Sequence, residues 1–397
     1  MGGRRSIVRG AAAGMSLVLA VACAPPPGEP PTTTSDSSGF QLDPAQTGAV
    51  SAPEISVPGL TRKWGVTFAG TPSYAVMSGD TVMVTARTSS AGYGTTLYAL
   101  SAADGQQRWS YHLGGTYYWS ALTAENGVVF ALNFDGVLRA LRVADGGILW
   151  QQQLQQYSYN APPVVKDGVV YASGSGSGGT LTAVNAATGG ILWAASVGNG
   201  AIDAPSVDST GVYSSHVCDT AKFSLSGARL WSIPSGCSGG GGKHATLDPV
   251  ARRLYVRQYA LSSSNFIADA DTGAKGTILI NGSPYALHGG SAFTVANGVL
   301  VKVDPATGSQ LWSMGGDPND TLTGAPVIVN GTVIVGGTSG TLYGISAANG
   351  ARVLTTSAGA PIASLDEQNV TRPTSGTGVG AGLVTVTTTT GVVAFGN

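Results

Sequence analysis

The sequence predicts an all-β protein, an eight-bladed β-propeller with four antiparallel strands in each blade. Three observations lead to this fold class. The composition is rich in turn-forming glycine, one strand–turn unit recurs along the chain, and the two ends of the repeated region supply complementary parts of one further unit. A seven-bladed ring is the alternative if one of the weaker units, the fifth or the sixth, does not form a blade of its own.

The composition suits a turn-rich β protein. Of 397 residues, 59 are glycine, 43% are hydrophobic and 10% are charged, so the chain has ample apolar material for a core. The net charge of −1 gives no basic surface to neutralise phosphates, and nucleic-acid binding is therefore not expected.

The recurring unit is a short apolar strand, a tight turn that ends in glycine, and an aromatic or apolar residue four positions later. The turn glycines are Gly105, Gly146, Gly189, Gly227, Gly273, Gly308 and Gly350. The residues four positions later are Trp109, Trp150, Trp193, Trp231, Thr277, Trp312 and Leu354. Successive glycines are 41, 43, 38, 46, 35 and 42 residues apart, which is the period of one four-stranded propeller blade.

Each unit also contains an upstream hairpin. In residues 161–172 the pair Asp167-Gly168 supplies the positive φ angles that a tight hairpin turn requires. Asn126-Gly127 and Asn330-Gly331 stand in equivalent places. The hairpin gives strands A and B of a blade, and the strand–turn–strand unit gives strands C and D.

The two ends of the repeated region are predicted to close the ring. Residues 382–397 are typical of strands B and C, at 383–386 and 392–395, and no strand D follows them. Residues 61–68 are an orphan strand D with Trp64 at the repeated tryptophan position. Pairing the two completes an eighth, composite blade and removes the exposed edges of an open sheet.

These repeats resemble the PQQ-like β-propeller repeat family over roughly residues 57–397. The resemblance implies that each repeat tryptophan packs between neighbouring blades, so none of them is a candidate site residue. A lipidated propeller of eight blades is also similar in architecture to the outer-membrane β-barrel assembly lipoprotein of Gram-negative bacteria, which is a scaffold.

The N-terminus has the layout of an export signal. Arg4, Arg5 and Arg9 precede an uncharged run, residues 10–22, that is too short to span a bilayer. Residues 1–22 are therefore predicted to be a signal peptide. The Arg4-Arg5 pair leaves open whether export follows the general or the twin-arginine route.

Residues 19–23, Leu-Ala-Val-Ala-Cys, resemble the lipobox of bacterial lipoproteins. The resemblance implies that Cys23 is lipidated and anchors the protein to the extracytoplasmic face of the cell membrane. Ala20 departs from the pattern, because the family more often has leucine there. Ordinary cleavage near Ala22, which would release a soluble secreted protein, is the alternative.

The segment that follows is rich in proline, threonine, serine and glycine, and its one aromatic residue is Phe40. Such a composition cannot bury enough apolar surface to fold. The predicted organisation is therefore a signal peptide at 1–22, a disordered tether at 23–53 and the propeller at 54–397.

No cofactor is predicted. Some members of the PQQ-like superfamily are dehydrogenases that hold a quinone and calcium at the propeller centre, commonly with a disulfide between adjacent cysteines. This sequence has no adjacent cysteines, and most of its blades have short loops. PQQ with calcium nevertheless stays open as the alternative.

No metal site or catalytic residue is predicted either. The histidines fall in different blades without metal-ligand spacing; they are His112, His216, His244 and His288. Residues 269–273 resemble the start of a calcium loop but lack its downstream acid. The Gly-Ser tract at 174–178 matches a nucleophile elbow in letters alone, because it lies between two strands.

Two cysteines remain in the mature chain beside Cys23. Cys218 lies near the B–C turn of the fourth unit and Cys237 near its D–A exit, on the same face of a propeller. A disulfide between them is expected in an oxidising compartment.

Aromatic residues mark a candidate binding face. They lie on the exits from the first and second units, at Tyr117, Tyr118, Trp119, Tyr157 and Tyr159. Clustered Tyr and Trp offer rigid apolar area with a polar handle for a peptide or a sugar. Packing between blades is the alternative role for these side chains.

Three functions follow as hypotheses. The first is a monomeric, non-enzymatic envelope lipoprotein that presents a propeller face to a protein partner. The second is a PQQ-dependent oxidoreductase, and the third is binding of cell-wall carbohydrate through the aromatic loops.

Overall fold

The structure is a computed structural model that describes residues 1–3, 36–176, 178–198, 203–216, 218–235, 244–257, 265–367 and 370–397. The chain divides into two compact units, Met1–Thr34 and Ser35–Asn397, and the fold below is that of the second unit. Residues 10–22 and Cys23 lie outside the described residues, so the signal peptide and the lipid anchor remain predictions. No helix within the described ranges is long and apolar enough to cross a bilayer.

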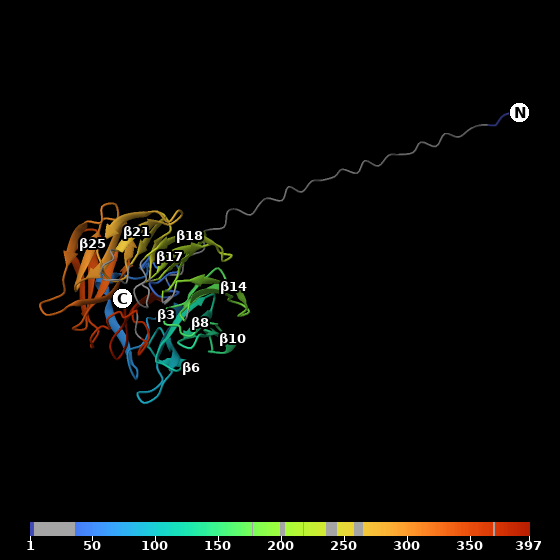
Figure 1. Ribbon diagram of the computed structural model, residues 1–397. Helices are drawn as coiled ribbons and strands as arrows, with labels where there is room; N and C mark the ends of the chain where they lie inside the picture. Colours follow the sequence, from blue (N-terminus) through green and yellow to red (C-terminus); the bar gives the residue numbers. More distant parts are fainter. Residues whose placement is uncertain are drawn as a thin grey trace. The chain divides into compact units, whose positions relative to one another are not determined.

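The second unit is an eight-bladed β-propeller, as predicted. It consists of eight sheets that follow one another in chain order (Figure 1), each with four antiparallel strands, and the sheet of blade 7 carries a fifth, parallel strand, β1 (Ala49–Val50). The first strands of neighbouring sheets contact one another around most of the ring. Strand A of each blade therefore lies nearest the axis, and strand D lies on the outside.

The first four blades each use four consecutive strands. Their strands are β3 (Val76–Ser78), β4 (Thr81–Arg87), β5 (Thr95–Ser101) and β6 (Gln107–Gly114) in blade 1; β7 (Ser120–Glu125), β8 (Val128–Asn133), β9 (Val137–Arg142) and β10 (Ile148–Gln153) in blade 2; β11 (Val164–Lys166), β12 (Val169–Gly174), β13 (Gly179–Asn185) and β14 (Ile191–Val197) in blade 3; and β15 (Ser206–Asp208), β16 (Gly211–Ser215), β17 (Asp219–Phe223) and β18 (Arg229–Pro234) in blade 4.

Blades 5 to 7 repeat this order, and blade 8 is composite. Their strands are β19 (Thr246–Asp248), β20 (Arg253–Val256), β21 (Asn265–Asp269) and β22 (Lys275–Leu279) in blade 5; β23 (Ala286–His288), β24 (Ser291–Ala296), β25 (Val299–Val303) and β26 (Gln310–Met314) in blade 6; β27 (Leu322–Val329), β28 (Thr332–Gly337), β29 (Thr341–Ser346) and β30 (Arg352–Ser357) in blade 7; and β31 (Thr377–Gly380), β32 (Leu383–Thr387), β33 (Gly391–Gly396) and β2 (Thr61–Thr67) in blade 8.

The ring closes through β2, as the sequence predicts. This N-terminal strand pairs antiparallel with β33, with Trp64 opposite Ala394 and Val66 opposite Val392. In Figure 1 a blue strand lies beside the red C-terminal strands. Strand A of blade 8, β31, was not identified from the sequence. Its short, glycine-containing stretch has little of the apolar pattern that marks a strand.

The blades stack through their tryptophans. A β-bulge interrupts strand D just before the repeat tryptophan, as between Ile148 and Trp150, so Leu149 points outward while the indole points toward the next blade. The indole N–H of Trp109 donates to the carbonyl of Val143 in blade 2 at 2.8 Å, and Trp150 donates to Ala186 in blade 3 at 2.9 Å. The predicted packing role of the tryptophans is confirmed.

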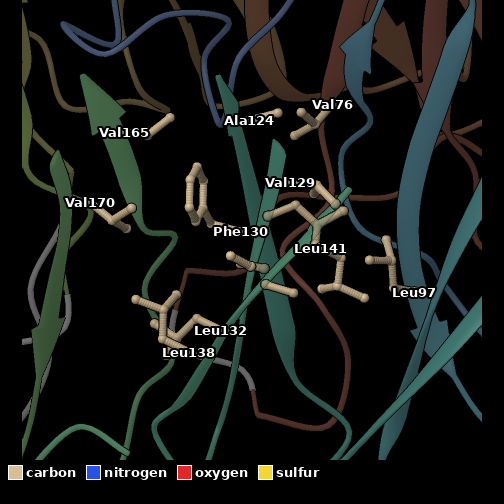
Figure 2. Packing of buried hydrophobic residues seen from close by; sticks show 14 of the residues in the cluster. Val76, Leu97, Ala124, Val129, Phe130, Leu132, Leu138, Leu141, Val165 and Val170 are labelled. Atoms are coloured by element: carbon tan, nitrogen blue, oxygen red, sulfur yellow. The ribbon is translucent and has the colours of Figure 1, made fainter. Parts of the chain in front are cut away.

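The hydrophobic core lies between neighbouring sheets. In Figure 2, Leu97 of blade 1, Phe130 and Leu141 of blade 2 and Val170 of blade 3 belong to one buried cluster. These side chains come from the faces that each twisted sheet turns toward its neighbours. Among the described residues the core thus consists of separate clusters, each of which joins neighbouring blades.

The two faces of the ring differ in the connections that they carry. The turn face carries the A–B and C–D turns, such as Asn126-Gly127 and Gly146, and the loop face carries the B–C and D–A connections, such as residues 88–94 and 115–119. Asn126 and Gly127 have φ angles of +52° and +75°, which confirms the predicted hairpin turn.

Part of the predicted tether is folded. Residues 36–53 belong to the second unit, and we call residues 36–50 the axial segment. Phe40 and Leu42 in this segment are buried, and β1 (Ala49–Val50) pairs parallel with β27. The short 3-10 helix η1 (Val57–Gly59) then leads into β2. The prediction of a disordered tether was wrong for residues 36–53, because ring contacts supply the burial that the local sequence lacks.

Candidate functional site

The axial segment fills the turn-face side of the ring. Strand A of a blade has a free edge toward the axis, and backbone groups of the axial segment pair with it. The carbonyls of Ser37, Ser38, Pro44, Ala45, Thr47, Gly48 and Val50 accept hydrogen bonds from strand-A N–H groups or the residue just after the strand, in blades 1, 2, 4, 5, 6 and 7. The N–H of Ser37 donates to Val379 of blade 8 at 2.7 Å. The segment thus satisfies backbone groups that an open channel would leave to water.

Phe40 occupies the axis itself. Its ring meets Tyr74 edge-on at a centroid distance of 5.5 Å and His244 at 4.9 Å. Tyr74 precedes strand A of blade 1 and His244 precedes strand A of blade 5, which are opposite positions in a ring of eight. Phe40 is 2% exposed. One side chain of the axial segment therefore bridges the two sides of the ring.

His244 is buried beside this ring and is held in one orientation. Its Nδ1 accepts the backbone N–H of Ala204 at 2.7 Å, so the proton of the neutral imidazole lies on Nε2. Nε2 is 3.6 Å from Oε1 of Glu367. Burial lowers the pKa of His244, and the Glu367 carboxylate opposes this effect. Desolvation is the larger influence and favours the neutral form.

A buried ion pair spans the loop-face side of the axis. Arg257 follows β20 in blade 5 and binds both carboxylate oxygens of Glu367, at 2.7 and 2.8 Å. Glu367 belongs to the β30–β31 connection, residues 358–376, of which 368 and 369 lie outside the described residues. The Arg257 guanidinium also donates to the carbonyl of Gly282 at 3.0 and 3.1 Å. This pair ties the connection to blade 5.

The same connection contacts the opposite side of the ring. The carbonyl of Val370 accepts the N–H of Tyr118, and the indole N–H of Trp119 donates to the hydroxyl of Thr374 at 3.4 Å. The β30–β31 connection therefore contacts both the start of blade 2 and blade 5 on the loop face.

A Ser–His–Asp arrangement lies beside this region in blade 4. The hydroxyl of Ser214 is 3.3 Å from Nε2 of His216, whose Nδ1 is 3.4 Å from Asp203. The same hydroxyl is 3.1 Å from the Asp203 carboxylate, and all three side chains are buried. A hydroxyl that donates to the carboxylate and has no route to solvent is not an activated nucleophile. The cluster is a set of buried polar groups in which Asp203 accepts the hydroxyl of Ser214 and the backbone N–H of Ser215.

Aromatic side chains gather on the loop face of blades 1 and 2. We call this group the aromatic surface: Tyr93, Tyr117, Tyr118 and Phe134, with Arg87. Tyr93 stacks on Tyr118 with centroids 5.1 Å apart, and Tyr117 packs against Phe134 at 4.4 Å. The guanidinium of Arg87 lies 3.8 Å from the centroid of Tyr118. Arg87 and Tyr93 together cover the ring of Tyr118.

The exposed part of the aromatic surface differs from the sequence prediction. Tyr93 is 65% exposed and Tyr117 is 41% exposed, whereas Trp119 and Tyr159 are buried. Tyr157 is 86% exposed but makes no ring contact with the aromatic surface among the described residues. The predicted binding role was wrong for Trp119 and Tyr159, because their rings face the core. Tyr93, Phe134 and Arg87 were missed.

The predicted disulfide is only half described. Cys218 lies between β16 and β17, in the B–C connection of blade 4, as expected. Cys237 lies outside the described residues, so the bond between the two cysteines remains a prediction.

The fold, its bladed repeat and the tryptophan contacts define a PQQ-like β-propeller. The family described as outer membrane protein assembly factor BamB matches residues 50–200, 134–273 and 296–395. These matches cover most of the chain, so the protein belongs to this family. No curated protein matches the chain in sequence.

Solved structures share the fold at low identity. A europium-containing methanol dehydrogenase aligns over 90% of each chain, with a TM-score of 0.70 and 13% identity. Quinohemoprotein alcohol dehydrogenase from Comamonas testosteroni aligns over 91% of this chain and 81% of its own, with a TM-score of 0.68 and 13% identity. BamB from Moraxella catarrhalis aligns over 85% of this chain and all of its own, with a TM-score of 0.62 and 16% identity.

The residues at the axis do not fit a quinone cofactor. Phe40, Tyr74 and His244 are packed against one another where a planar ligand would need an open space. Arg257 and Glu367, which carry opposite charges near the axis, bind each other rather than facing a cavity. Among the described residues, no group of His, Cys, Asp or Glu side chains is arranged to hold a metal ion.

Proposed function

We propose that this protein is a non-enzymatic scaffold of the cell envelope that binds a protein partner through its loop face. The observation that carries the proposal is the filled axis: in the part of the chain that the structure describes, Phe40 and the pair of Arg257 and Glu367 occupy the centre, where a cofactor and a substrate would have to meet. The name of the family, an outer membrane protein assembly factor, supports a scaffolding role. The protein is proposed to act as an exported monomer anchored by lipidated Cys23 on the extracytoplasmic face.

The aromatic surface is the proposed contact for the partner. Tyr93 and Tyr117 offer rigid apolar area next to the Arg87 cation, and such residues are enriched at the energetic centres of protein interfaces. Sugar binding is less well supported, because Trp119 is in the core and the Tyr118 ring is covered by its neighbours. If the protein bound wall glycans on a glycan array and Tyr93→Ala abolished this binding, the carbohydrate alternative would be favoured.

Photo-crosslinking in the native cell tests the partner proposal. A benzophenone amino acid at Tyr93, on the loop face, is expected to form a defined adduct with an extracytoplasmic protein. The same group at Ala103, an exposed residue in the C–D turn of the same blade, is the matched control and is expected to form none. Equal adducts at both positions, or none at Tyr93, would contradict the proposal.

The oxidoreductase alternative has its own support, since two of the solved structures above are dehydrogenases. Calorimetric titration of residues 36–397 with PQQ and Ca²⁺ distinguishes the two functions. Stoichiometric binding together with dehydrogenase activity would replace the scaffold proposal. The expected result is no heat of binding, and no visible absorption band in the purified protein before titration.

A further inference from the structure

Asp36, the first described residue of the second unit, is fixed to the turn face of the propeller. The carboxylate of Asp36 accepts the N–H of Gly79 at 2.8 Å and the N–H of Ala381 at 3.2 Å. Gly79 lies in the A–B turn of blade 1, and Ala381 lies in the A–B turn of blade 8. The covalent link of Asp36 to the preceding residue therefore lies at the inner rim of the turn face, a place that we call the exit point.

This exit point is held firmly. Directly after Asp36, Ser37 is 1% exposed and its backbone bonds to Val379 on one side and to Met77 on the other. Phe40 follows at the axis. A force applied to the N-terminal chain is therefore borne by hydrogen bonds to blades 1 and 8 and by a buried aromatic ring, and the exit point does not shift along the surface.

We infer that the propeller is held with its turn face toward the membrane and its loop face away from it. The inference rests on the lipid anchor at Cys23 that the proposed function includes. Cys23 and Asp36 are separated by 13 residue steps, which span at most about 45 Å. Five of the 12 residues between them are proline, and an extended proline-rich chain of 13 steps spans about 40 Å.

The opposite orientation requires nearly the whole of that length. From the inner rim, the chain would first cross the three strand spacings of a blade, about 14 Å. It would then run along the outside of a seven-residue strand, about 24 Å, before it reached the plane of the loop face. The turn-face orientation does not require the chain to bend around the ring, and a proline-rich chain is stiff over several residues.

The orientation restricts the kind of partner. The aromatic surface lies on the loop face, so it is presented to the extracytoplasmic space, about one strand length, or 24 Å, farther from the bilayer than the turn face. A partner must be a soluble extracytoplasmic protein or a membrane protein whose domain extends beyond that height. A segment that lies in the headgroup region does not reach Tyr93.

Energy transfer to labelled lipid tests the orientation. The full-length lipidated protein is reconstituted in vesicles of phosphatidylcholine and phosphatidylglycerol with a rhodamine-labelled headgroup lipid. A donor dye is attached to Ala103→Cys on the turn face or to Ser90→Cys on the loop face, both exposed positions of blade 1. Because β5 separates them by about 24 Å, transfer from Ala103 is expected to exceed that from Ser90 at least about twofold. Equal transfer, or more from Ser90, would overturn the inference.

Two further variants separate the causes. Cys23→Ser is expected to stay in solution, and if it bound vesicles as well as the native chain, the anchor proposal would fail independently of orientation. A flexible insertion of about 30 residues after Pro27 is expected to bring the two transfer values together, because the tether then reaches around the ring. A difference that persisted with this insertion would mean that surface contacts set the orientation, which contradicts the inference from tether length.

Discussion

The indole of Trp109 lies so close to Gly146 of the next blade that a Cβ on this glycine would come within 2.6 Å of the ring. Gly146 also has a φ of +71°, in the left-handed region that side chains disfavour. The same contact recurs around the ring, for Trp64 with Gly105, Trp150 with Gly189, Trp193 with Gly227 and Trp231 with Gly273. The repeat glycine therefore both forms the turn and receives the tryptophan of the preceding blade.

Two glycine variants separate these roles. Gly127→Ala has the same type of backbone strain, with φ +75° and nothing near the new Cβ, and is expected to lose about 1–2 kcal/mol of unfolding free energy. Gly146→Ala must also displace the indole, and is expected to lose about 1–3 kcal/mol more. Urea unfolding measures both. Equal losses would show that the tryptophan contact adds nothing.

Phe40→Ala tests the axial segment. Removing a buried aromatic ring between Tyr74 and His244 is expected to lower the free energy of unfolding by about 3–5 kcal/mol. Tyr157→Ala, which removes an exposed aromatic ring, is expected to change it by less than about 0.5 kcal/mol. If Phe40 belonged to a disordered tether, the two variants would unfold alike.

Glu367→Gln tests the ion pair that ties the β30–β31 connection to blade 5. The change leaves the buried Arg257 guanidinium without a counter-charge, and a loss of about 3–5 kcal/mol is expected. The exposed pair of Arg108 and Asp80 has similar bidentate geometry, so Asp80→Asn is a matched control whose loss of stability is expected to be much smaller, because solvent screens an exposed pair. A small effect of Glu367→Gln in the same denaturation series would argue against the buried pair.

The stability of the fold is expected to decrease as the pH falls through about 6.5. Burial lowers the pKa of His244 in the folded state, so below the ordinary histidine pKa the unfolded chain binds a proton that the folded chain does not. The stabilisation is therefore complete above that pH and is lost below it. Thermal midpoints between pH 5 and 8 measure the slope. His244→Gln is expected to flatten the pH dependence of the thermal midpoint, whereas His112→Gln, at an exposed site, is expected to retain it. If the pH dependence were unchanged in His244→Gln, another group would be its source.

The disulfide predicted between Cys218 and Cys237 is open to a direct test. Intact mass spectrometry of the protein purified without reductant is expected to show a gain of two mass units on reduction. A peptide that joins the two cysteines should appear in an unreduced digest. Two free thiols in protein purified without reductant would refute the bond.

The repeat made most of the fold predictable from sequence. Glycine turns and tryptophans at a fixed spacing are local features, and each contact between blades uses the same two positions, so the blade, the ring and its closure through Trp64 follow from the pattern. The axial segment leaves no such trace. Its pairing uses backbone carbonyls, which any sequence supplies, and its single anchor, Phe40, stands among residues typical of a tether.

The candidate site was predictable only in its location. Aromatic residues in the D–A connections mark the loop face, but the direction of a ring depends on packing that composition does not encode. Tyr159 enters the core because Gly136 and Gly174 leave room for its ring. Tyr93 was missed because it lies in a short glycine- and serine-rich loop. That loop brings it to Tyr118 only after the blade has formed.

The axial segment also sets an order of assembly. It is among the first residues of the propeller to be synthesised, yet Ser37 bonds to Val379, 342 positions later. The contacts of this innermost segment are therefore complete only when the last blade has formed. Contacts at such sequence separation make folding slow, so the axis is expected to stay accessible to other molecules until the ring has closed.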